Sequence, residues 1–264
     1  MPTYALLGAT GATGSAILRC LLEQPPKDLA LNILVRNKAK LDKAFPLLQT
    51  TEAFAIDVTE GTPSDGAALQ RSLKGASVVF MCIATNVSTR GVSLSYDTTR
   101  AIIDALEALR EEQGTSYIKP TILQLRTASL NEVFIAHHSW QQRFGCTAAS
   151  FCLHYVYSDL DRAAKLLQSS AASMPECLDY VFVDPPALHD ADGTTRTGYE
   201  LVMKGEGTDG VSYADLGAAF CEIAEKREKF LGQGVGVSAT GKVNETWGVL
   251  IGYLSGGVKA RFFG

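Results

Sequence analysis

The fold of this chain is indicated by one stretch near its beginning, Tyr4-Ala5-Leu6-Leu7-Gly8-Ala9-Thr10-Gly11-Ala12-Thr13-Gly14-Ser15. A short apolar run ends at a glycine, and two further glycines follow at intervals of three residues. An amphipathic segment with Ile17, Leu18 and Leu21 on one face comes next. Because apolar residues at this spacing are typical of a helix, the order predicts a strand, a tight turn and a helix.

Each glycine of this turn has its own physical role in the prediction. Gly8 can adopt the positive φ that leaves the strand, Gly11 lets a phosphate approach the backbone, and Gly14 lets the helix pack close to the strand. A second apolar segment at residues 31–35 follows, as dinucleotide folds require, although the spacing is GxxGxxG rather than GxGxxG. The sequence therefore predicts a pyrophosphate site at a helix N-terminus, and its contact residues are Gly8, Thr10, Gly11, Ala12, Thr13 and Gly14.

The segment after the second strand bears on the choice of cofactor. In dinucleotide folds, an acidic residue there accepts hydrogen bonds from the ribose of NAD, whereas a basic residue accommodates the 2′-phosphate of NADP. Here the residue is Arg36, whose planar guanidinium can hold a phosphate, and Lys38 adds positive charge. The alternative is that these residues only begin a solvated helix. We predict NADP(H) as the cofactor.

Two further strand ends supply candidate cofactor contacts. A strand at residues 53–56 is followed by Asp57 and Val58, which could meet the adenine, although Asp57 could equally cap a helix. A strand at residues 78–84 is apolar throughout, as a central parallel strand should be. It ends at Ala84, close to Asn86, at the edge of the sheet where ligands bind. We expect Asp57, Val58, Ala84 and Asn86 to contact the cofactor.

Strands and helices alternate along most of the chain. We expect helices at 38–48, 67–73 and 93–112, strands at 121–125 and 178–183, and a Rossmann-like α/β fold with a doubly wound parallel sheet. After residue 184 the pattern loosens. The polar stretch 189–198 could be a substrate loop or a solvated connection, and a helix at 213–226, a strand at 235–237 and a helix at 243–254 follow. We predict one domain, with a core at about 1–184 and a small C-terminal substrate lobe at about 185–264.

Composition limits the partners of the protein. The chain has 264 residues, 46% of them apolar, and a net charge of −4 with scattered basic residues, which argues against nucleic acid and anionic membranes. The first strand leaves no room for a signal peptide, and no apolar run approaches a membrane span. Six cysteines and four histidines lack metal-ligand spacing. We therefore expect a cytoplasmic protein with a small-molecule substrate and no metal, while its oligomeric state stays open.

Several segments together carry a family resemblance. They are Gly8, Gly11 and Gly14, Arg36, Asp57-Val58, Ile83-Ala84, the run from Tyr157 to Ala164, and Asp184-Pro185-Pro186. In this order they resemble the atypical short-chain dehydrogenases/reductases of the NmrA-like, NAD(P)-binding class. The ending, from Ala239 to Gly257, is similar to fungal tailoring proteins of the averufin-oxidase type, which act on aromatic polyketides. The resemblance implies an NADP-dependent oxidoreductase of secondary metabolism.

The resemblance also singles out catalytic candidates. Reductases of this family usually carry a Tyr-x-x-x-Lys pair and an upstream serine. Tyr157 stands at the expected place, but the residue four positions later is Asp161, and no tyrosine of this chain has a lysine at that spacing. A carboxylate one helical turn from a phenol would raise the pKa of that phenol, which opposes proton relay at neutral pH. Tyr157 could instead be a packed aromatic residue.

The upstream hydroxyl has two candidates, Thr127 and Ser129. Either could lie near the nicotinamide, or could be a loop residue that bonds its own backbone. Arg126, directly before them, is a candidate binder of an anionic or phenolate substrate.

Three functions fit these features. The first is an NADPH-dependent oxidoreductase that acts on a quinone-like or aromatic polyketide substrate, which can delocalise the charge left by hydride addition. The second is a non-redox regulator of the NmrA type that senses NADP(H). The third is an isomerase or cyclase with Asp161 or Asp159 as its base.

Overall fold

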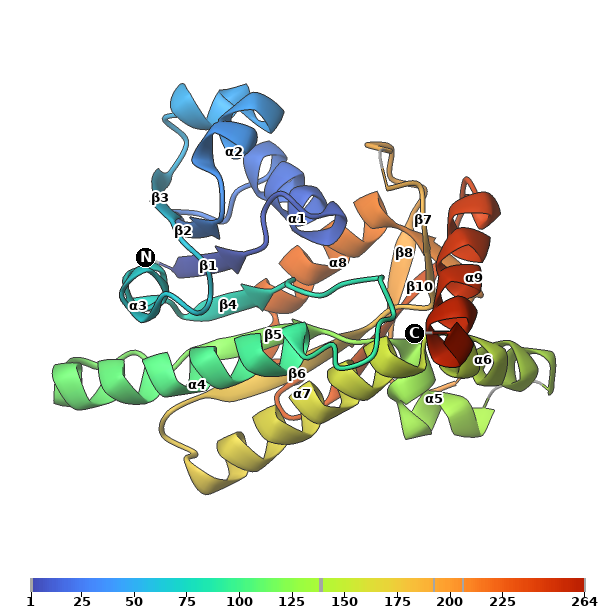
Figure 1. Ribbon diagram of the computed structural model, residues 1–264. Coiled ribbons are helices and arrows are strands. Elements are labelled where there is room, and N and C mark those ends of the chain that lie inside the picture. Colours follow the sequence, from blue (N-terminus) through green and yellow to red (C-terminus); the bar gives the residue numbers. More distant parts are fainter. Residues whose placement is uncertain (1, 138–139, 192, 206, 264) are drawn as a thin grey trace.

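Figure 1 shows a computed structural model of the protein, which describes residues 2–137, 140–191, 193–205 and 207–263. Its centre is an eight-stranded sheet in the order β3-β2-β1-β4-β5-β6-β10-β8, and a two-stranded sheet pairs β7 with β9. The strands are β1 Thr3–Leu7, β2 Ala30–Val35, β3 Ala55–Glu60, β4 Val78–Met81, β5 Thr121–Leu125, β6 Asp179–Asp184, β7 Ala187–His189, β8 Tyr199–Val202, β9 Gly210–Ser212 and β10 Gly234–Ala239. All pairs in the large sheet are parallel except β10 with β8.

Helices cover both faces of this sheet, as the alternation of elements predicts. The α-helices are α1 Ala12–Glu23, α2 Lys38–Ala44, α3 Gly66–Leu73, α4 Leu94–Gln113, α5 Glu132–His137, α6 Trp140–Cys152, α7 His154–Ser173, α8 Tyr213–Glu225 and α9 Trp247–Phe263. One hydrophobic core joins α1 and α8 to the sheet through residues such as Ile17, Leu21 and Phe220. The other joins α3, α4 and α7 to the opposite face through residues such as Leu106 and Leu167. Figure 1 shows these two layers on either side of the strands.

Several element boundaries differ from the prediction, among them the end of β4 at Met81 instead of residue 84, and two of the differences have identifiable reasons. The helix expected at 38–48 ends at Ala44, and a 3-10 turn, Pro46–Gln49, follows. Pro46 has no N–H group to donate and its ring clashes with a preceding carbonyl, so it stops the α-helix. The strand expected at 53–56 lies instead at Ala55–Glu60, because β3 pairs along the whole length of β2, from Ala30 opposite Ala55 to Val35 opposite Glu60.

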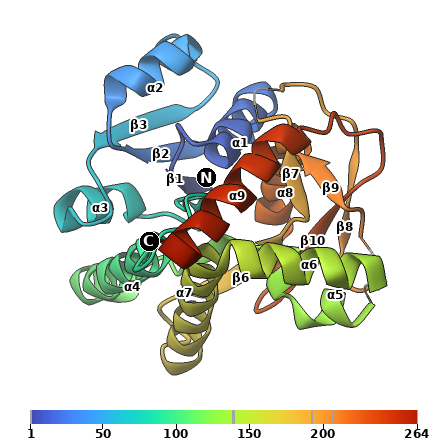
Figure 2. The same ribbon diagram turned by 45° about the vertical axis from the view of Figure 1, so that its right-hand side comes forward.

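The C-terminal part of the chain supplies two strands of the large sheet and a helix that covers it. Strand β10 enters the large sheet beside β6 and carries β8 on its outer edge, and α8 packs against α1. Helix α9 lies across the strand ends (Figure 2). Its Gly257 packs against the Cys152 carbonyl and the side chain of Ser88. It starts later and ends later than the predicted helix at 243–254. Within the described residues, no helix combines the length and apolar character needed to cross a membrane.

Candidate nucleotide-binding and catalytic site

The glycine turn has the geometry that the sequence predicts. Gly8 has φ +92°, a conformation that side chains rarely tolerate, and its carbonyl accepts a hydrogen bond from the Gly11 amide at 2.9 Å. A Cβ on Gly14 would lie 2.7 Å from the Gly8 carbonyl carbon and 3.0 Å from the Ala9 Cα atom. The chain can therefore pass directly from β1 into α1 only because Gly14 has no side chain.

The N-terminus of α1 is suited to hold a pyrophosphate. Gly11 is the N-cap, it is exposed, and it makes no side-chain capping bond. The first turn of α1 carries no acidic residue, and the Ser15 hydroxyl is directed back to the Ala9 carbonyl at 3.0 Å. Unpaired amides and the positive end of the helix dipole therefore face outward at this point, where a phosphate group would be stabilised.

Arg36 and Lys38 both lie at the carboxyl end of β2, next to the glycine turn. Both residues are exposed. Glu60, at the end of the neighbouring strand β3, accepts a hydrogen bond from the Lys38 backbone amide at 3.0 Å, and Asn37 caps α2 through the Lys40 amide at 2.7 Å. These bonds fix the start of α2 and leave the Arg36 guanidinium at the surface beyond the turn.

Asp57 and Val58 lie within β3 rather than after it. Asp57 stands opposite Asn32 in the β2 ladder, three residues before the strand ends at Glu60. The prediction that these two residues follow the strand end is therefore wrong, since the ladder continues beyond them. Ala84 and Asn86 do follow β4, which ends at Met81, and both are exposed.

Asn86 meets a residue that the sequence analysis missed. The Asn86 side chain lies close to the phenol of Tyr213, the first residue of α8, and Tyr253 of α9 lies nearby. Burial raises the pKa of Tyr213, Tyr253 adds to this rise, and Asn86 opposes it. The sequence carries no local signal for this contact, because it depends on how α8 and α9 pack over the loop after β4.

Tyr157, Thr127 and Ser129 are brought together at the end of β5. The hydroxyls of Ser129 and Thr127 both lie close enough to the Tyr157 phenol to affect its pKa, and Ser129 donates to the Cys146 sulfur at 3.3 Å. Burial raises the pKa of Tyr157, and the two hydroxyls oppose that rise. The phenol is therefore held in its neutral form near neutral pH, as a proton donor rather than a base.

Asp161 and Asp159 are occupied elsewhere. Asp161 is 41% exposed and forms an ion pair with Lys165 at 2.7 Å. The raised pKa of Tyr157 comes from burial, with a smaller contribution from Cys146, and not from Asp161 as the sequence suggested. Asp159 is buried and accepts the backbone amides of Ser95 at 2.8 Å and Tyr96 at 3.1 Å, so it caps the start of α4. Neither carboxylate lies in the Tyr157 cluster.

Arg126 is not available to a substrate. It donates from Nε and Nη2 to the two carboxylate oxygens of Asp184, at 2.7 and 2.6 Å, and lies over the Phe182 ring at 4.2 Å. Asn131 donates to the same carboxylate at 2.7 Å. Burial raises the pKa of Asp184, while Arg126 and Asn131 oppose the rise. The role as substrate binder considered for Arg126 is therefore replaced by a structural ion pair between β5 and β6.

The C-terminal end of the polar stretch 189–198 is held by hydrogen bonds. The buried carboxylate of Asp215 accepts hydrogen bonds from the Thr197 amide and hydroxyl, at 3.1 and 2.8 Å, and from the Gly198 amide at 3.1 Å. Ser212 also donates to Asp215, at 2.6 Å. Residues 197 and 198 are thus fixed against the first turn of α8.

The parallel sheet, the glycine turn and the open helix N-terminus define a Rossmann-type dinucleotide-binding protein. The family described as NAD(P)H-binding matches residues 8–227, and the chain belongs to that family, whose cofactor is a nicotinamide dinucleotide. The resemblance to an NAD(P)-binding family is confirmed, and the protein is an oxidoreductase of that family.

Two relatives are similar to this chain over nearly its whole length. The chain is 53% identical to averufin oxidase A of Dothistroma septosporum over 266 residues, which covers 99% of this chain and 92% of the relative. It is 45% identical to averufin oxidase stcO of Emericella nidulans over 269 residues, covering 96% and 88%. A short-chain dehydrogenase/reductase of Veillonella parvula in complex with NADP has a TM-score of 0.65 at 18% identity, covering 93% of this chain and 98% of that one. That structure supports the fold.

Proposed function

We propose that this protein is an NADPH-dependent oxidoreductase that acts on a quinone-like or aromatic polyketide substrate of secondary metabolism. The observation that carries the preference for NADPH is Arg36. Its exposed guanidinium stands at the end of β2, beside the strand whose glycine turn would hold the pyrophosphate. A guanidinium in this place can pair with the 2′-phosphate that distinguishes NADP from NAD.

The substrate class rests on the relatives and on the chemistry of the site. The relatives' names refer to averufin, and the resemblance associates such proteins with aromatic polyketides. When bound, the nicotinamide would exchange a hydride with the substrate. A quinone-like ring spreads the resulting negative charge, so the developing anion needs only a weak proton donor. This explains how the protein can work without a lysine four residues after Tyr157.

In this proposal, Tyr157 supplies the proton. Its neutral phenol lies beside the hydroxyls of Thr127 and Ser129, at the carboxyl end of β5 where ligands bind in such sheets. The phenol of Tyr213, close to Asn86 after the neighbouring strand β4, is a second polar group for the substrate. We assign the substrate-binding elements to the C-terminal part, with α9 as the cover over these strand ends.

The test is an assay of cofactor consumption. Purified protein is mixed with NADPH and a set of anthraquinones, including averufin, while the absorbance of reduced nicotinamide is followed. We expect NADPH to be consumed with at least one anthraquinone, and NADH to be consumed far more slowly. Because quinones can also oxidise NADPH without an enzyme, the control is the same mixture with the Gly14→Val variant.

The other outcomes support the remaining functions. Tight NADPH binding without consumption on any substrate would support a sensor of the NADP(H) ratio. Conversion of a polyketide precursor without loss of cofactor would support an isomerase. The structure gives no specific support to the isomerase, since Asp159 and Asp161, its candidate bases, are engaged by α4 and by Lys165.

A further inference from the structure

Two thiols face each other between the helices that cover one face of the sheet. Helices α1 and α8 are in backbone contact where a Cβ on Gly217 would lie 2.5 Å from the Ala16 carbonyl carbon and 2.8 Å from the Ala16 Cβ. One helical turn further along each helix, four residues on, stand Cys20 and Cys221. Since residues four apart share a helix face, the close approach at Ala16 and Gly217 brings the two cysteines together.

The contacts of the two sulfur atoms agree with this placement. The thiols of Cys20 and Cys221 are close enough for each to shift the pKa of the other. The Cys221 sulfur also lies 3.9 Å from the carbonyl oxygen of Ile17, on α1. Disulfide formation requires two cysteines whose Cα atoms are within about 7 Å and whose side chains converge. Helices α1 and α8 are in backbone contact one turn away, and the Cys221 sulfur already reaches the backbone of α1, so the two thiols are placed to meet that requirement.

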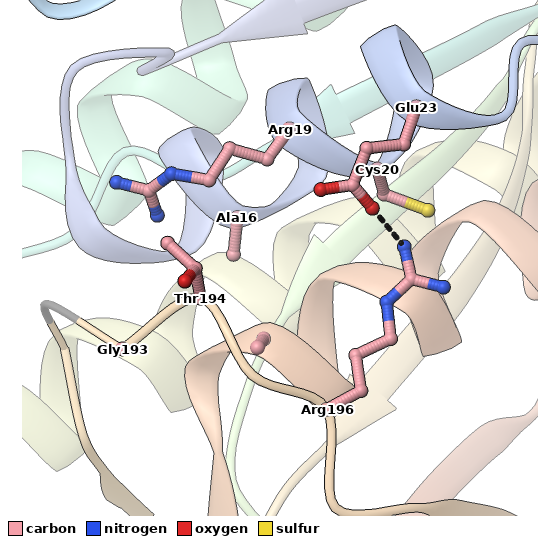
Figure 3. A pocket seen from close by; sticks show the side chains of 8 residues that line it. Ala16, Arg19, Cys20, Glu23, Gly193, Thr194 and Arg196 are labelled. Carbon is pink, nitrogen blue, oxygen red and sulfur yellow. Dashed lines mark hydrogen bonds and ion pairs between the residues drawn. The ribbon is translucent and has the colours of Figure 1, made fainter.

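A cationic group stands beside one of the two thiols. Figure 3 shows the Cys20 side chain next to the guanidinium of Arg196, which forms an ion pair with Glu23 at 3.1 Å. The neighbouring Cys221 lowers the pKa of Cys20, Arg196 lowers it further, and burial opposes both. Because the cation stands beside the Cys20 sulfur, Cys20 is the readier thiolate of the pair.

A small cavity leads to Cys20. Its volume is about 10 Å³, and it is lined by Ala16, Arg19, Cys20, Glu23, Gly193, Thr194, Arg196 and Ala214. A cavity of this volume holds about one water-sized molecule. Cys20 and Cys221 are otherwise closed off, with exposed fractions of 6% and 7%. Access is thus restricted to small reagents such as hydrogen peroxide, and bulky oxidants are excluded.

We propose that Cys20 and Cys221 form a peroxide-responsive dithiol that closes to a disulfide between α1 and α8. The Cys20 thiolate attacks one peroxide oxygen, the O–O bond breaks, and water leaves after protonation of the second oxygen. The Cys221 thiol then attacks the resulting Cys20 sulfenic acid. The S–S bond forms, the S–O bond breaks, and a second water carries away the Cys221 proton. One peroxide is reduced to two waters while two thiols are oxidised to one disulfide.

The position of this bridge gives it a structural consequence. Helix α1 begins at the glycine turn, and α8 begins at Tyr213, next to Asn86. A covalent link between the two helices fixes both of these N-terminal ends relative to each other. The proposal concerns the thiols alone and does not depend on which nicotinamide cofactor binds.

The experiment uses the full-length protein, reduced and then freed of reductant. It is treated with one equivalent of hydrogen peroxide and digested without reduction. We expect a peptide that joins Cys20 to Cys221 and an intact mass lower by two hydrogen atoms. In Cys221→Ser, dimedone should trap a sulfenic acid on Cys20. Cys152→Ser is the matched control, since Cys152 lies on α6, and it should form the same bridge as the natural protein.

The role of Arg196 is tested by rate. Arg196→Gln should slow bridge formation roughly tenfold by removing the cation beside the Cys20 sulfur. Arg19→Gln, which changes another arginine of the same cavity, one stacked over Phe45, should leave the rate unchanged. Cumene hydroperoxide should react far more slowly than hydrogen peroxide. An oxidised natural protein without the Cys20–Cys221 peptide, or with dimedone labelling chiefly at other cysteines, would overturn the proposal, whatever the variants do.

Discussion

Arg126 and Asp184 form a two-point ion pair at the carboxyl ends of β5 and β6, with N–O distances of 2.7 and 2.6 Å. The carboxylate of Asp184 is fully buried, and the Arg126 side chain is 12% exposed. An arginine that looks like a substrate ligand in the sequence thus fastens two neighbouring strands beside the candidate catalytic tyrosine. Its loss should therefore affect the stability of the fold before it affects substrate binding.

We expect Arg126→Gln to lower the free energy of unfolding by about 3–5 kcal/mol, because it leaves the Asp184 carboxylate buried without its charged partner. Urea denaturation measures this value. The control is Lys165→Gln, which removes an exposed partner of Asp161 and should leave the free energy of unfolding unchanged. Unaltered stability of Arg126→Gln with a raised KM for the substrate would restore the interpretation as a substrate ligand.

Two glycines of the turn should respond differently to alanine. A Cβ on Gly14 would overlap the Gly8 carbonyl group, so Gly14→Ala should lower stability by about 1–3 kcal/mol, or roughly 2–10 °C in Tm. A Cβ on Gly11 would meet only the Gly8 oxygen, at 3.3 Å. Gly11→Ala should therefore keep its Tm within about 2 °C. It should still weaken NADPH binding about tenfold or more, because the methyl group occupies the phosphate approach.

Calorimetric titration and thermal unfolding measure the two effects separately. If Gly11→Ala bound NADPH as well as the natural protein, the pyrophosphate could not lie against this turn.

Arg36→Ala should discriminate between the two nicotinamide cofactors. Loss of charge-assisted bonds worth about 1.5–3 kcal/mol predicts NADP(H) binding weaker by about ten- to a hundredfold, with NAD(H) binding almost unchanged. Titration with both cofactors measures the ratio. Arg71→Ala changes an exposed arginine on α3 and serves as the charge control. Equal losses for both cofactors would contradict the assignment of Arg36 to the 2′-phosphate.

Tyr157→Phe should lower kcat by about ten- to a hundredfold, because it removes a general acid but leaves hydride transfer intact. KM should change little, since the ring remains. Asp161→Asn should leave kcat unchanged, because its carboxylate is paired with Lys165 at the helix surface. Steady-state kinetics with the anthraquinone found in the assay decide between the two residues. A full loss in Asp161→Asn with none in Tyr157→Phe would reverse their roles.

Stability should fall in mild acid through His189. This side chain is 1% exposed, and its Nδ1 accepts the Thr246 amide at 3.1 Å, so it is neutral at that nitrogen. Burial lowers the pKa of His189 below its usual value of 6.5, with Glu245 opposing the shift. The unfolded chain therefore binds the proton more readily than the folded one. The stability that neutral His189 contributes is fully present above pH 6.5, and it is lost as the pH falls through 6.5 toward the folded-state pKa.

Unfolding by urea at a series of pH values measures the slope. His189→Gln should flatten it between pH 7 and 5.5, and an unchanged slope would assign the effect to other groups.

Local rules of the chain were sufficient for the architecture. The glycine spacing, the apolar run of β4 and the helical periodicity of α4 depend on near neighbours, so the sequence predicted the doubly wound sheet and the turn at Gly8 and Gly14. Pro46, which ends α2, is also readable from the sequence, although the predicted helix ran past it. These features follow from backbone sterics and hydrophobic burial within short segments.

Which side chains meet depends on how these segments pack in three dimensions. The ladder with β2 placed Asp57 inside β3, the packing of α7 against α4 and β6 brought Tyr157 to Thr127 and Ser129, and the contact of α1 with α8 placed Cys20 near Cys221. The partners in the last pair are separated by 201 positions along the chain. Strand register and helix crossing are set by shape complementarity across the core, which no single segment contains.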